Sequence, residues 1–433
     1  MTPVGDLWSR VAERVRSATR GRGTPPAIAA LDIGTEFAKA LVLSVERDPD
    51  GRLVGIVRGT GRQRQGLSHM QSGTVSDIDA VVANCRVAVD AAREMAGRRP
   101  MAAVIGIAGE LVKGTTSLST ARRDDPRMPL DDAELSRLVG RAQEQALRDA
   151  EDRIRWESGV ERLDVRLVHA AIVEMRIDGY PVSNPIGFTG SQVELHIFNA
   201  YAPMVHLGAL ASVAAALDLE LLGVIAEPYA VATCLDPGEL GDAGAVFVDV
   251  GGGTTDVALV RGGGIGGTKM LALGGRAFTK GLVERLGVSF ADAERAKLAV
   301  SSGGDGGAGA EVSETLLEDA RIWRDGVELM IGDLAGEDLL PGRILLCGGG
   351  SDLPQVRQVL DEDDWWSHLP FARRPKVRAL APDEVVGLRD ATGTLTTRQD
   401  VTPLALAHQA LILDAGASAV DRAMRGVVRE LDL

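Results

Sequence analysis

The segment from Val246 to Val260, VFVDVGGGTTDVALV, restricts the possible folds more than any other part of the sequence. Two apolar runs flank three consecutive glycines, and a helix would not tolerate three glycines at its centre. A simple hairpin needs only two turn residues. The extra glycines therefore indicate that a ligand approaches this backbone closely, where a Cβ would stand in its way.

A second segment near the start of the chain has the same plan. In Ala27–Val45, AIAALDIGTEFAKALVLSV, an apolar run ends at Asp32, a turn with glycine and threonine follows, and a second apolar run begins. Both segments are rich in the residues that favour strands. Asp32 and Asp249 lie 217 positions apart (249 − 32), about half of the chain. The sequence therefore predicts two related lobes that face each other.

The two turns predict a site for phosphate and a divalent cation. Consecutive backbone N–H groups in a turn of glycine and threonine form a concave nest that favours phosphate oxygens. The residues of this kind are Gly34, Thr35, Gly251, Gly252, Gly253, Thr254 and Thr255. An aspartate beside phosphate repels it unless a cation lies between them, and Mg²⁺ is usually held by one or two carboxylates together with waters and phosphates. We therefore expect Asp32 and Asp249 to hold Mg²⁺ through water. The alternative is that each is an ordinary glycine turn that begins with aspartate.

A third glycine turn lies in Arg343–Val356, RILLCGGGSDLPQV. An apolar strand leads into Gly348, Gly349, Gly350 and Ser351, after which a helix begins. A strand that feeds glycines into a helix start suits the phosphate or sugar of a nucleotide.

A helix is also expected over residues 293–300, where Glu294 and Lys297 share one face because they are three positions apart. From the residues alone, this pair is a surface ion pair.

Composition excludes several classes of protein. The chain has 433 residues, of which 45% are apolar and 25% charged, as in a soluble globular protein of roughly two to four domains. A net charge of −14 gives no sign of nucleic-acid binding. The three cysteines are widely spaced, which fits a reducing cytoplasm and neither a disulfide framework nor a metal site. The sequence has no GxxxxGK[ST] motif, and the run Gly262–Gly267 is expected to be a hairpin loop and no dinucleotide site.

Three motifs in order resemble those of the superfamily that contains actin, the heat-shock chaperones and the sugar kinases. DIGT from Asp32, DVGGGTTD from Asp249 and LLCGGGSDL from Leu345 resemble its first phosphate, second phosphate and adenosine motifs. The resemblance implies that ATP and Mg²⁺ bind between the lobes.

Further segments extend this resemblance. Residues 226–230 resemble the first connecting motif, which implies that Glu227 helps to hold the waters of Mg²⁺ and positions the attacking water. Residues 293–297 are similar to the segment that contacts the ribose, which assigns ligand contacts to Glu294 and Lys297. Residues 403–407 resemble the second connecting motif, a hinge helix between the lobes.

Within the superfamily, the middle of the chain resembles the bacterial cell-division protein family FtsA. The segments that carry this resemblance are Asp178–Tyr180, Asn184–Gly190 and Val193–Ile197. The likeness covers residues 27–430. In one respect the chain differs from that family, because the seven-residue step from Asp32 to Lys39 is more like PilM of type IV pilus assembly.

The resemblance implies an α/β fold of two actin-like (ribonuclease-H-like) ATPase lobes with an inserted α+β subdomain. The expected parts are an amphipathic helix and linker in 1–26, the first lobe in 27–108 and 201–243, the insert in 109–200, the second lobe in 244–384, and a return to the first lobe in 385–433. In the insert, the alternating strand Val193–Ile197 could pair with the edge of another subunit or pack against the insert's own helix.

The implied function is that of an ATP-binding cytoskeletal scaffold of FtsA type, which links the inner face of the cell membrane to a division assembly. It would assemble with itself, would bind no nucleic acid, and would be a slow ATPase at most. One alternative is a PilM-like cytoplasmic adaptor that grips a short peptide of a membrane partner. Another is a small-molecule kinase, although no cluster of sugar-binding side chains lies near the first hairpin.

The start of the chain predicts a contact with the membrane. Val4, Leu7, Trp8, Val11 and Val15 fall at helical spacing and form one apolar stripe. Residues 1–26 contain five arginines against two acidic residues, a local net charge of +3. A basic amphipathic helix with tryptophan on its apolar face is typical of a helix that lies in a membrane interface. The alternatives are that it packs on the first lobe or stays disordered. At the other end, residues 417–433 are neutral and are expected to be the closing helix of the first lobe.

Overall fold

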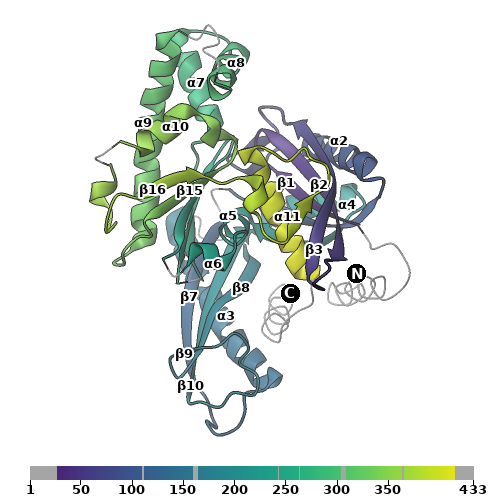
Figure 1. Cartoon of the computed structure of the whole chain (residues 1–433), viewed down its shortest axis with the longest axis vertical. Helices are drawn as coiled ribbons and strands as arrows, with labels where there is room; N and C mark the ends of the chain where they lie inside the picture. Colours follow the sequence, from purple (N-terminus) through teal and green to yellow (C-terminus); the bar gives the residue numbers. More distant parts are fainter. Residues whose placement is uncertain are drawn as a thin grey trace.

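The computed structural model describes residues 27–109, 112–158, 164–241, 243–262, 264–303, 309–362 and 365–414 (Figure 1). The predicted membrane helix with Leu7, Trp8, Val11 and Val15 therefore lies outside the described residues, as does the predicted closing helix over 417–433.

The first lobe is built on a six-stranded sheet with the order β11-β6-β1-β2-β3-β17. Its strands are β1 (Ala27–Ile33), β2 (Phe37–Arg47), β3 (Leu53–Arg64), β6 (Pro100–Ile107), β11 (Glu220–Ala226) and β17 (Leu388–Asp390). The strand β2 is antiparallel to its neighbours β1 and β3, whereas β6 and β11 run parallel to β1. Every residue of β1 is buried, as expected for a strand covered on both faces.

The second lobe repeats this arrangement. The strands β12 (Ala245–Val250), β13 (Thr255–Arg261), β14 (Gly264–Leu271), β15 (Arg343–Cys347) and β16 (Lys376–Ala379) have the order β14-β13-β12-β15-β16, with the same parallel and antiparallel pairings as β3-β2-β1-β6-β11. The register repeats as well, because Asp32 lies opposite Lys39 and Asp249 opposite Asp256. The prediction of two related lobes is therefore confirmed. The expected loop at Gly262–Gly267 is wrong in part, since β14 begins at Gly264.

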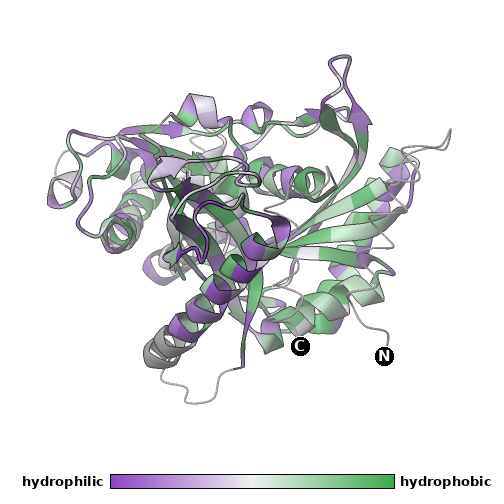
Figure 2. Cartoon of the chain, turned by 90° about the horizontal axis from the view of Figure 1, so that it is seen from below, coloured by the Kyte–Doolittle hydropathy of each residue, from purple (hydrophilic) through white to green (hydrophobic). Residues whose placement is uncertain are grey.

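Helices cover the outer face of each sheet. In the first lobe they are α2 (Ile78–Ala96) and α4 (Met204–Ala216), and in the second lobe α7 (Gly275–Leu286), α8 (Phe290–Ser301), α9 (Ala310–Ala335) and α10 (Pro354–Leu360). The short elements are β4 (Met70–Gln71), β5 (Thr74–Val75), α6 (Pro237–Leu240) and the 3₁₀ turns η1 (Gly349–Asp352), η2 (Trp365–His368), η3 (Pro382–Glu384) and η4 (Arg398–Asp400). In Figure 2 the central strands are largely hydrophobic, and the surrounding helices carry many hydrophilic residues.

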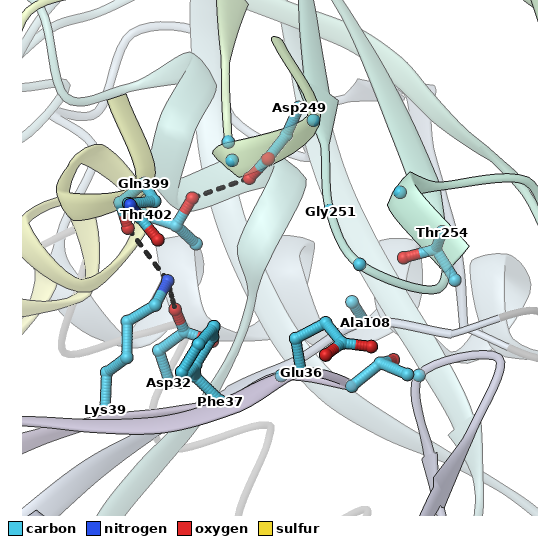
Figure 3. Close-up of a pocket in the computed structure, with 18 of the residues that line it drawn as sticks. Asp32, Glu36, Phe37, Lys39, Ala108, Asp249, Gly251, Thr254, Gln399 and Thr402 are labelled. Carbon is cyan, nitrogen blue, oxygen red and sulfur yellow. Dashed lines mark hydrogen bonds and ion pairs between the residues drawn. The ribbon is translucent and has the colours of Figure 1, made fainter. Parts of the chain in front are cut away.

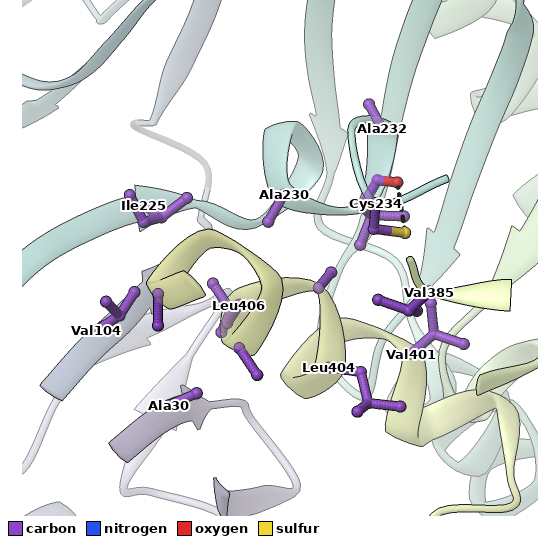
Figure 4. Packing of buried hydrophobic residues seen from close by; sticks show 14 of the residues in the cluster. Ala30, Val104, Ile225, Ala230, Ala232, Cys234, Val385, Val401, Leu404 and Leu406 are labelled. Carbon is purple, nitrogen blue, oxygen red and sulfur yellow. Dashed lines mark hydrogen bonds between the residues drawn. The ribbon is translucent and has the colours of Figure 1, made fainter. Parts of the chain in front are cut away.

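Two helices occupy the space between the sheets. One apolar cluster joins α5 (Glu227–Ala232) and α11 (Val401–Asp414) to the inner faces of both sheets (Figure 4). Leu404 and Leu406 of α11 belong to it, together with Ala30 and Val104 of the first sheet and Phe247 of the second. The segment that resembles a hinge helix therefore lies where it contacts both lobes.

The middle of the chain forms an α+β unit that extends away from the two lobes (Figure 1). Its elements are β7 (Lys113–Arg122), α3 (Asp132–Ser158), β8 (Val165–Ile177), β9 (Tyr180–Pro181) and β10 (Gln192–Pro203). The strand β7 also pairs with β14, which extends the second sheet to nine strands. Because β10 has β7 on one side and β8 on the other, its segment Val193–Ile197 has no free edge, and its apolar side chains pack with those of α3.

This packing predicts a local change in stability. Leu135 of α3 is fully buried against β10, so Leu135→Ala should remove about 2–5 kcal/mol of stability from the insert. Hydrogen exchange of the β10 amides measures the loss. The matched control is Leu118→Ala on β7, where the side chain is 59% exposed and little change is expected. Unchanged exchange in Leu135→Ala would contradict this packing.

Candidate functional site

A cavity of about 480 Å³ lies between the two lobes, and turns from both line it (Figure 3). The predicted site residues that line it are Asp32, Gly34, Thr35, Glu227, Asp249, Gly251, Gly252, Thr254, Glu294, Lys297, Gly348, Gly349 and Gly350. Segments that are far apart in the sequence therefore meet in one place, as the pattern of the three glycine turns predicted.

Three of the predicted site residues do not line the cavity. The hydroxyl of Thr255 donates to the backbone oxygen of Leu273 at 2.7 Å and accepts from Nε1 of the buried Trp323 at 2.8 Å. Ser351 donates to the backbone oxygen of Gly348 at 2.7 Å. Gly253 lies against the first hairpin. The contacts of these three residues are therefore with the turns and the core of the protein, and none of the three is among the residues that line the cavity.

The close approach that the glycines predicted is made, in this structure, by the opposite turn. A Cβ on Gly252 would lie 2.4 Å from Cγ of Glu36, and a Cβ on Gly253 would lie 2.7 Å from the hydroxyl of Thr35. Gly348 has a φ of +78°, and a Cβ there would lie 2.1 Å from Oδ1 of Asp249. Glycine at these positions allows the three turns to come together.

Four acidic side chains converge at the base of the cavity with one lysine among them. Lys39 Nζ lies 2.9 Å from Oδ2 of Asp32 and donates to the backbone oxygen of Gln399 at 2.8 Å (Figure 3). In the second lobe, Asp256 takes the position equivalent to that of Lys39. Thr402 of α11 donates to Oδ2 of Asp249 at 2.6 Å. Glu227, at the start of α5, completes the group.

Burial and mutual repulsion raise the pKa of three of these acids, Glu227, Asp249 and Asp256. Burial, followed by the charges of Asp32, Asp256 and Asp249, raises the pKa of Glu227 well above its usual value. Burial also raises the pKa of Asp249, and burial together with the charge of Asp249 raises the pKa of Asp256 to about 8. A divalent cation would favour the ionised forms. In the described part of the chain, no three acidic, histidine or cysteine side chains are placed to ligate a metal directly.

Glu294 and Lys297 form a buried pair at the side of the cavity. Lys297 Nζ lies 2.7 Å from Oε2 of Glu294 and donates to Gly275 O at 2.9 Å and to the Thr279 hydroxyl at 2.8 Å. The side chains of Lys297 and Glu294 are 9% and 11% exposed, so the prediction of a surface ion pair from the residues alone is wrong. Both side chains line the cavity.

Sequence reasoning missed several residues that line the cavity. They are Glu36, Phe37, Lys39 as a partner of Asp32, Arg62, Arg64, Asp256, Gln399 and Thr402. Arg62 stacks over the ring of Phe37, with its guanidinium carbon 3.5 Å from the ring centroid. The register of β2 and β3 brings these two side chains together. Asp256 and Lys39 lie in the two hairpins that the sequence analysis identified, so their places could have been inferred from the repeat.

The pKa of Asp256 predicts how stability depends on pH. Between about pH 4 and pH 8 the folded protein keeps the proton of Asp256 and the unfolded chain releases it, so stability should fall as pH rises through this range. Asp256→Asn should remove this part of the fall and stabilise the protein at pH 8 by on the order of a few kcal/mol. Urea unfolding with a chelator between pH 6 and 9 measures this. The exposed Asp333→Asn is the control. An identical pH slope in Asp256→Asn and wild type would disprove the assignment.

Comparisons with known proteins agree with the resemblance to FtsA. A family model described as cell division protein FtsA matches residues 246–392. The cell division protein FtsA of Pseudomonas aeruginosa is 27% identical over 385 residues, with 84% of this chain and 85% of the relative covered. FtsA of Neisseria meningitidis serogroup B is 25% identical over 414 residues, with 89% and 91% covered. The resemblance to the FtsA family is confirmed.

A solved structure shares the fold. The PilM-PilN type IV pilus biogenesis complex matches with a TM-score of 0.60 at 17% identity, covering 89% of this chain and 98% of the other. This likeness confirms the two-lobe actin-like fold.

None of the described helices combines the length and apolar character that crossing a bilayer requires.

Proposed function

We propose that this chain is an ATP-binding, actin-like scaffold of FtsA type that links a membrane to a cell-division assembly. The observation that carries the proposal is the convergence of three glycine turns and two aspartates, from both lobes, on one cavity. The similarity to FtsA proteins over most of the chain supports the role in division.

In this proposal, MgATP binds in the cavity between the lobes. The backbone N–H groups of the turns at Gly34 and Gly251 hold the phosphates. Asp32 and Asp249 hold Mg²⁺ through its waters. Glu294 and Lys297 break the ion pair between them and contact the ribose of ATP instead. The cation supplies the positive charge that allows the buried acids to ionise beside the phosphates.

Hydrolysis is expected to be slow. In this proposal Glu227 positions the attacking water, but burial and three neighbouring acids raise its pKa well above the usual range. A protonated carboxyl cannot accept a proton from water. The cation must therefore lower this pKa before Glu227 can act, which fits a protein that uses ATP to control assembly.

The first test is nucleotide binding. Asp249→Ala should weaken Mg²⁺-dependent ATP binding on the order of 10-fold or more, because a carboxylate that holds Mg²⁺ contributes at least ~1.4 kcal/mol. Calorimetry with MgATP measures the affinity, and circular dichroism checks the fold. Unchanged affinity would contradict the assignment of the cavity.

Thr255→Val should lower the stability of the fold without changing the affinity for nucleotide. The variant leaves the buried Nε1 of Trp323 without its hydroxyl partner, which should cost about 1–3 kcal/mol of stability. Since Thr255 does not line the cavity, the folded variant should bind MgATP like the wild type.

The insert over 109–200 is proposed to contact a neighbouring subunit or a division protein.

The second candidate function is that of a PilM-like adaptor in pilus assembly. It is favoured by the shared fold and by the seven-residue spacing of Asp32 and Lys39, whose side chains form an ion pair in the cleft. In this role the chain would bind a membrane protein's peptide without assembling into filaments. Pelleting with MgATP distinguishes the two roles, because only the scaffold should sediment as filaments.

The membrane link is proposed to be the helix predicted in residues 1–26. Arginines near an anionic surface contribute about 1 kcal/mol each, and Leu7 and Trp8 add roughly 1.5–3 kcal/mol each on burial. Leu7→Glu with Trp8→Glu should therefore release the protein from anionic vesicles in a flotation assay, and salt should weaken wild-type binding.

The control for this test is Ser9→Glu with Ser17→Glu, which adds the same charge on the opposite side of the predicted helix. It should lose much less binding than the Leu7 and Trp8 variant. Equal flotation of the wild type and the Leu7 and Trp8 variant would show that the anchor is wrong.

A further inference from the structure

Arg276, at the start of α7, connects the two phosphate-type turns across the cleft. Its backbone N–H donates to the backbone oxygen of Gly252 at 2.7 Å, and Gly275 donates to Gly251 at 2.9 Å. The backbone of this residue is therefore fixed to the turn of the second lobe.

Its side chain reaches the first lobe. Nη2 of Arg276 donates to the backbone oxygen of Thr35 at 2.8 Å, and Nη1 donates to that of Leu67 at 3.2 Å. Nε forms an ion pair with the carboxylate of Glu36. The two charged side chains are only 12% and 18% exposed, so water screens this pair less than a surface pair.

Glu36 is an acid placed against a turn that favours anions. Its stem lies so close to Gly252 that no Cβ would fit there, and Figure 3 shows its carboxylate on the side of the cleft that faces Gly251 and Thr254. Backbone N–H groups in such turns attract negative charge. The side chain of an acid from the first lobe therefore lies against the turn that is proposed to hold phosphate.

Further charges continue from this pair along the cavity. Arg64 lies 3.6 Å from Glu36 and 4.0 Å from Glu294, which in turn pairs with Lys297 at 2.7 Å. The signs alternate from Arg276 to Lys297. Glu36, Arg64, Glu294 and Lys297 line the cavity and Arg276 does not, so phosphate charge in the cavity competes with Glu36 for Arg276 only when Glu36 moves aside.

We propose that Glu36 and Arg276 form a latch that holds the two turns together without nucleotide, and that the phosphates of a bound nucleotide replace Glu36 as the partner of Arg276. This inference rests on the proposed nucleotide site. Arg276 then acts as a positioning residue that couples occupancy of the cleft to the contact between the lobes, because its ion pair with Glu36 is lost when phosphate displaces that carboxylate.

The test uses two variants, each of which replaces one charged side chain with a neutral one. If the ion pair were merely structural, both variants would change the nucleotide affinity in the same direction. Glu36→Gln removes the competing anion, so it should tighten binding of a fluorescent non-hydrolysable ATP analogue with Mg²⁺ by roughly fivefold. Arg276→Gln removes the phosphate partner, so it should weaken binding by roughly fivefold or more. The control is Glu318→Gln, which breaks an ion pair with Arg285 far from the cavity lining and should leave the affinity unchanged.

A second measurement needs no nucleotide. Hydrogen exchange of the amides at Gly251–Thr254 should become faster in both variants, since each opens the latch, and stay unchanged in the control. Unchanged exchange in both would overturn the latch. If the wild type binds the analogue but the two variants shift the affinity in the same direction, the displacement alone is overturned. If the wild type binds no nucleotide, the proposed function and the displacement both fail.

Discussion

The electrostatics of four acidic side chains in one buried cleft govern the rest of the site. Asp32, Glu227, Asp249 and Asp256 face a single lysine, Lys39, and burial raises the pKa of the last three acids. Such a cluster cannot be fully ionised without additional positive charge. In the proposed function, backbone N–H groups of the turns bind phosphate in the same place, so a divalent cation with a nucleotide would satisfy both requirements together.

The duplicated topology explains why these groups meet. Each lobe places a hairpin at the centre of its sheet, with an aspartate at the end of the first strand and a turn of small residues after it. The two hairpins share the same backbone arrangement but differ in charge, because Lys39 of one lobe corresponds to Asp256 of the other. The lysine neutralises Asp32 within its own lobe. Asp249 has hydrogen bonds from the Thr402 hydroxyl and the Cys347 thiol, which are neutral, and this asymmetry supports the proposal that the cation binds near the second lobe.

Local sequence patterns predicted the strands, the glycine turns and the acidic residues, because their spacing and apolar flanks are properties of short segments. Contacts that depend on register or on the packing of distant elements could not be predicted in this way. Arg276 reads as an ordinary helix residue, yet it reaches Thr35 across the cleft. Thr255 reads as a phosphate ligand, but the neighbouring Trp323 draws its hydroxyl into the core of the lobe. The sequence alone could not show whether the strand Val193–Ile197 lies at the edge or in the centre of its sheet, because this depends on the strands that pair with it.

Proton release on binding of MgATP tests this account most directly. Calorimetric titrations in two buffers of different ionisation enthalpy at pH 7 give the number of protons released. The account predicts release of about one proton or more, because the cation ionises acids that are protonated in the free cleft. It also predicts that a chelator abolishes binding. Heats that do not depend on the buffer, or equal ATP affinity with and without Mg²⁺, would contradict the account.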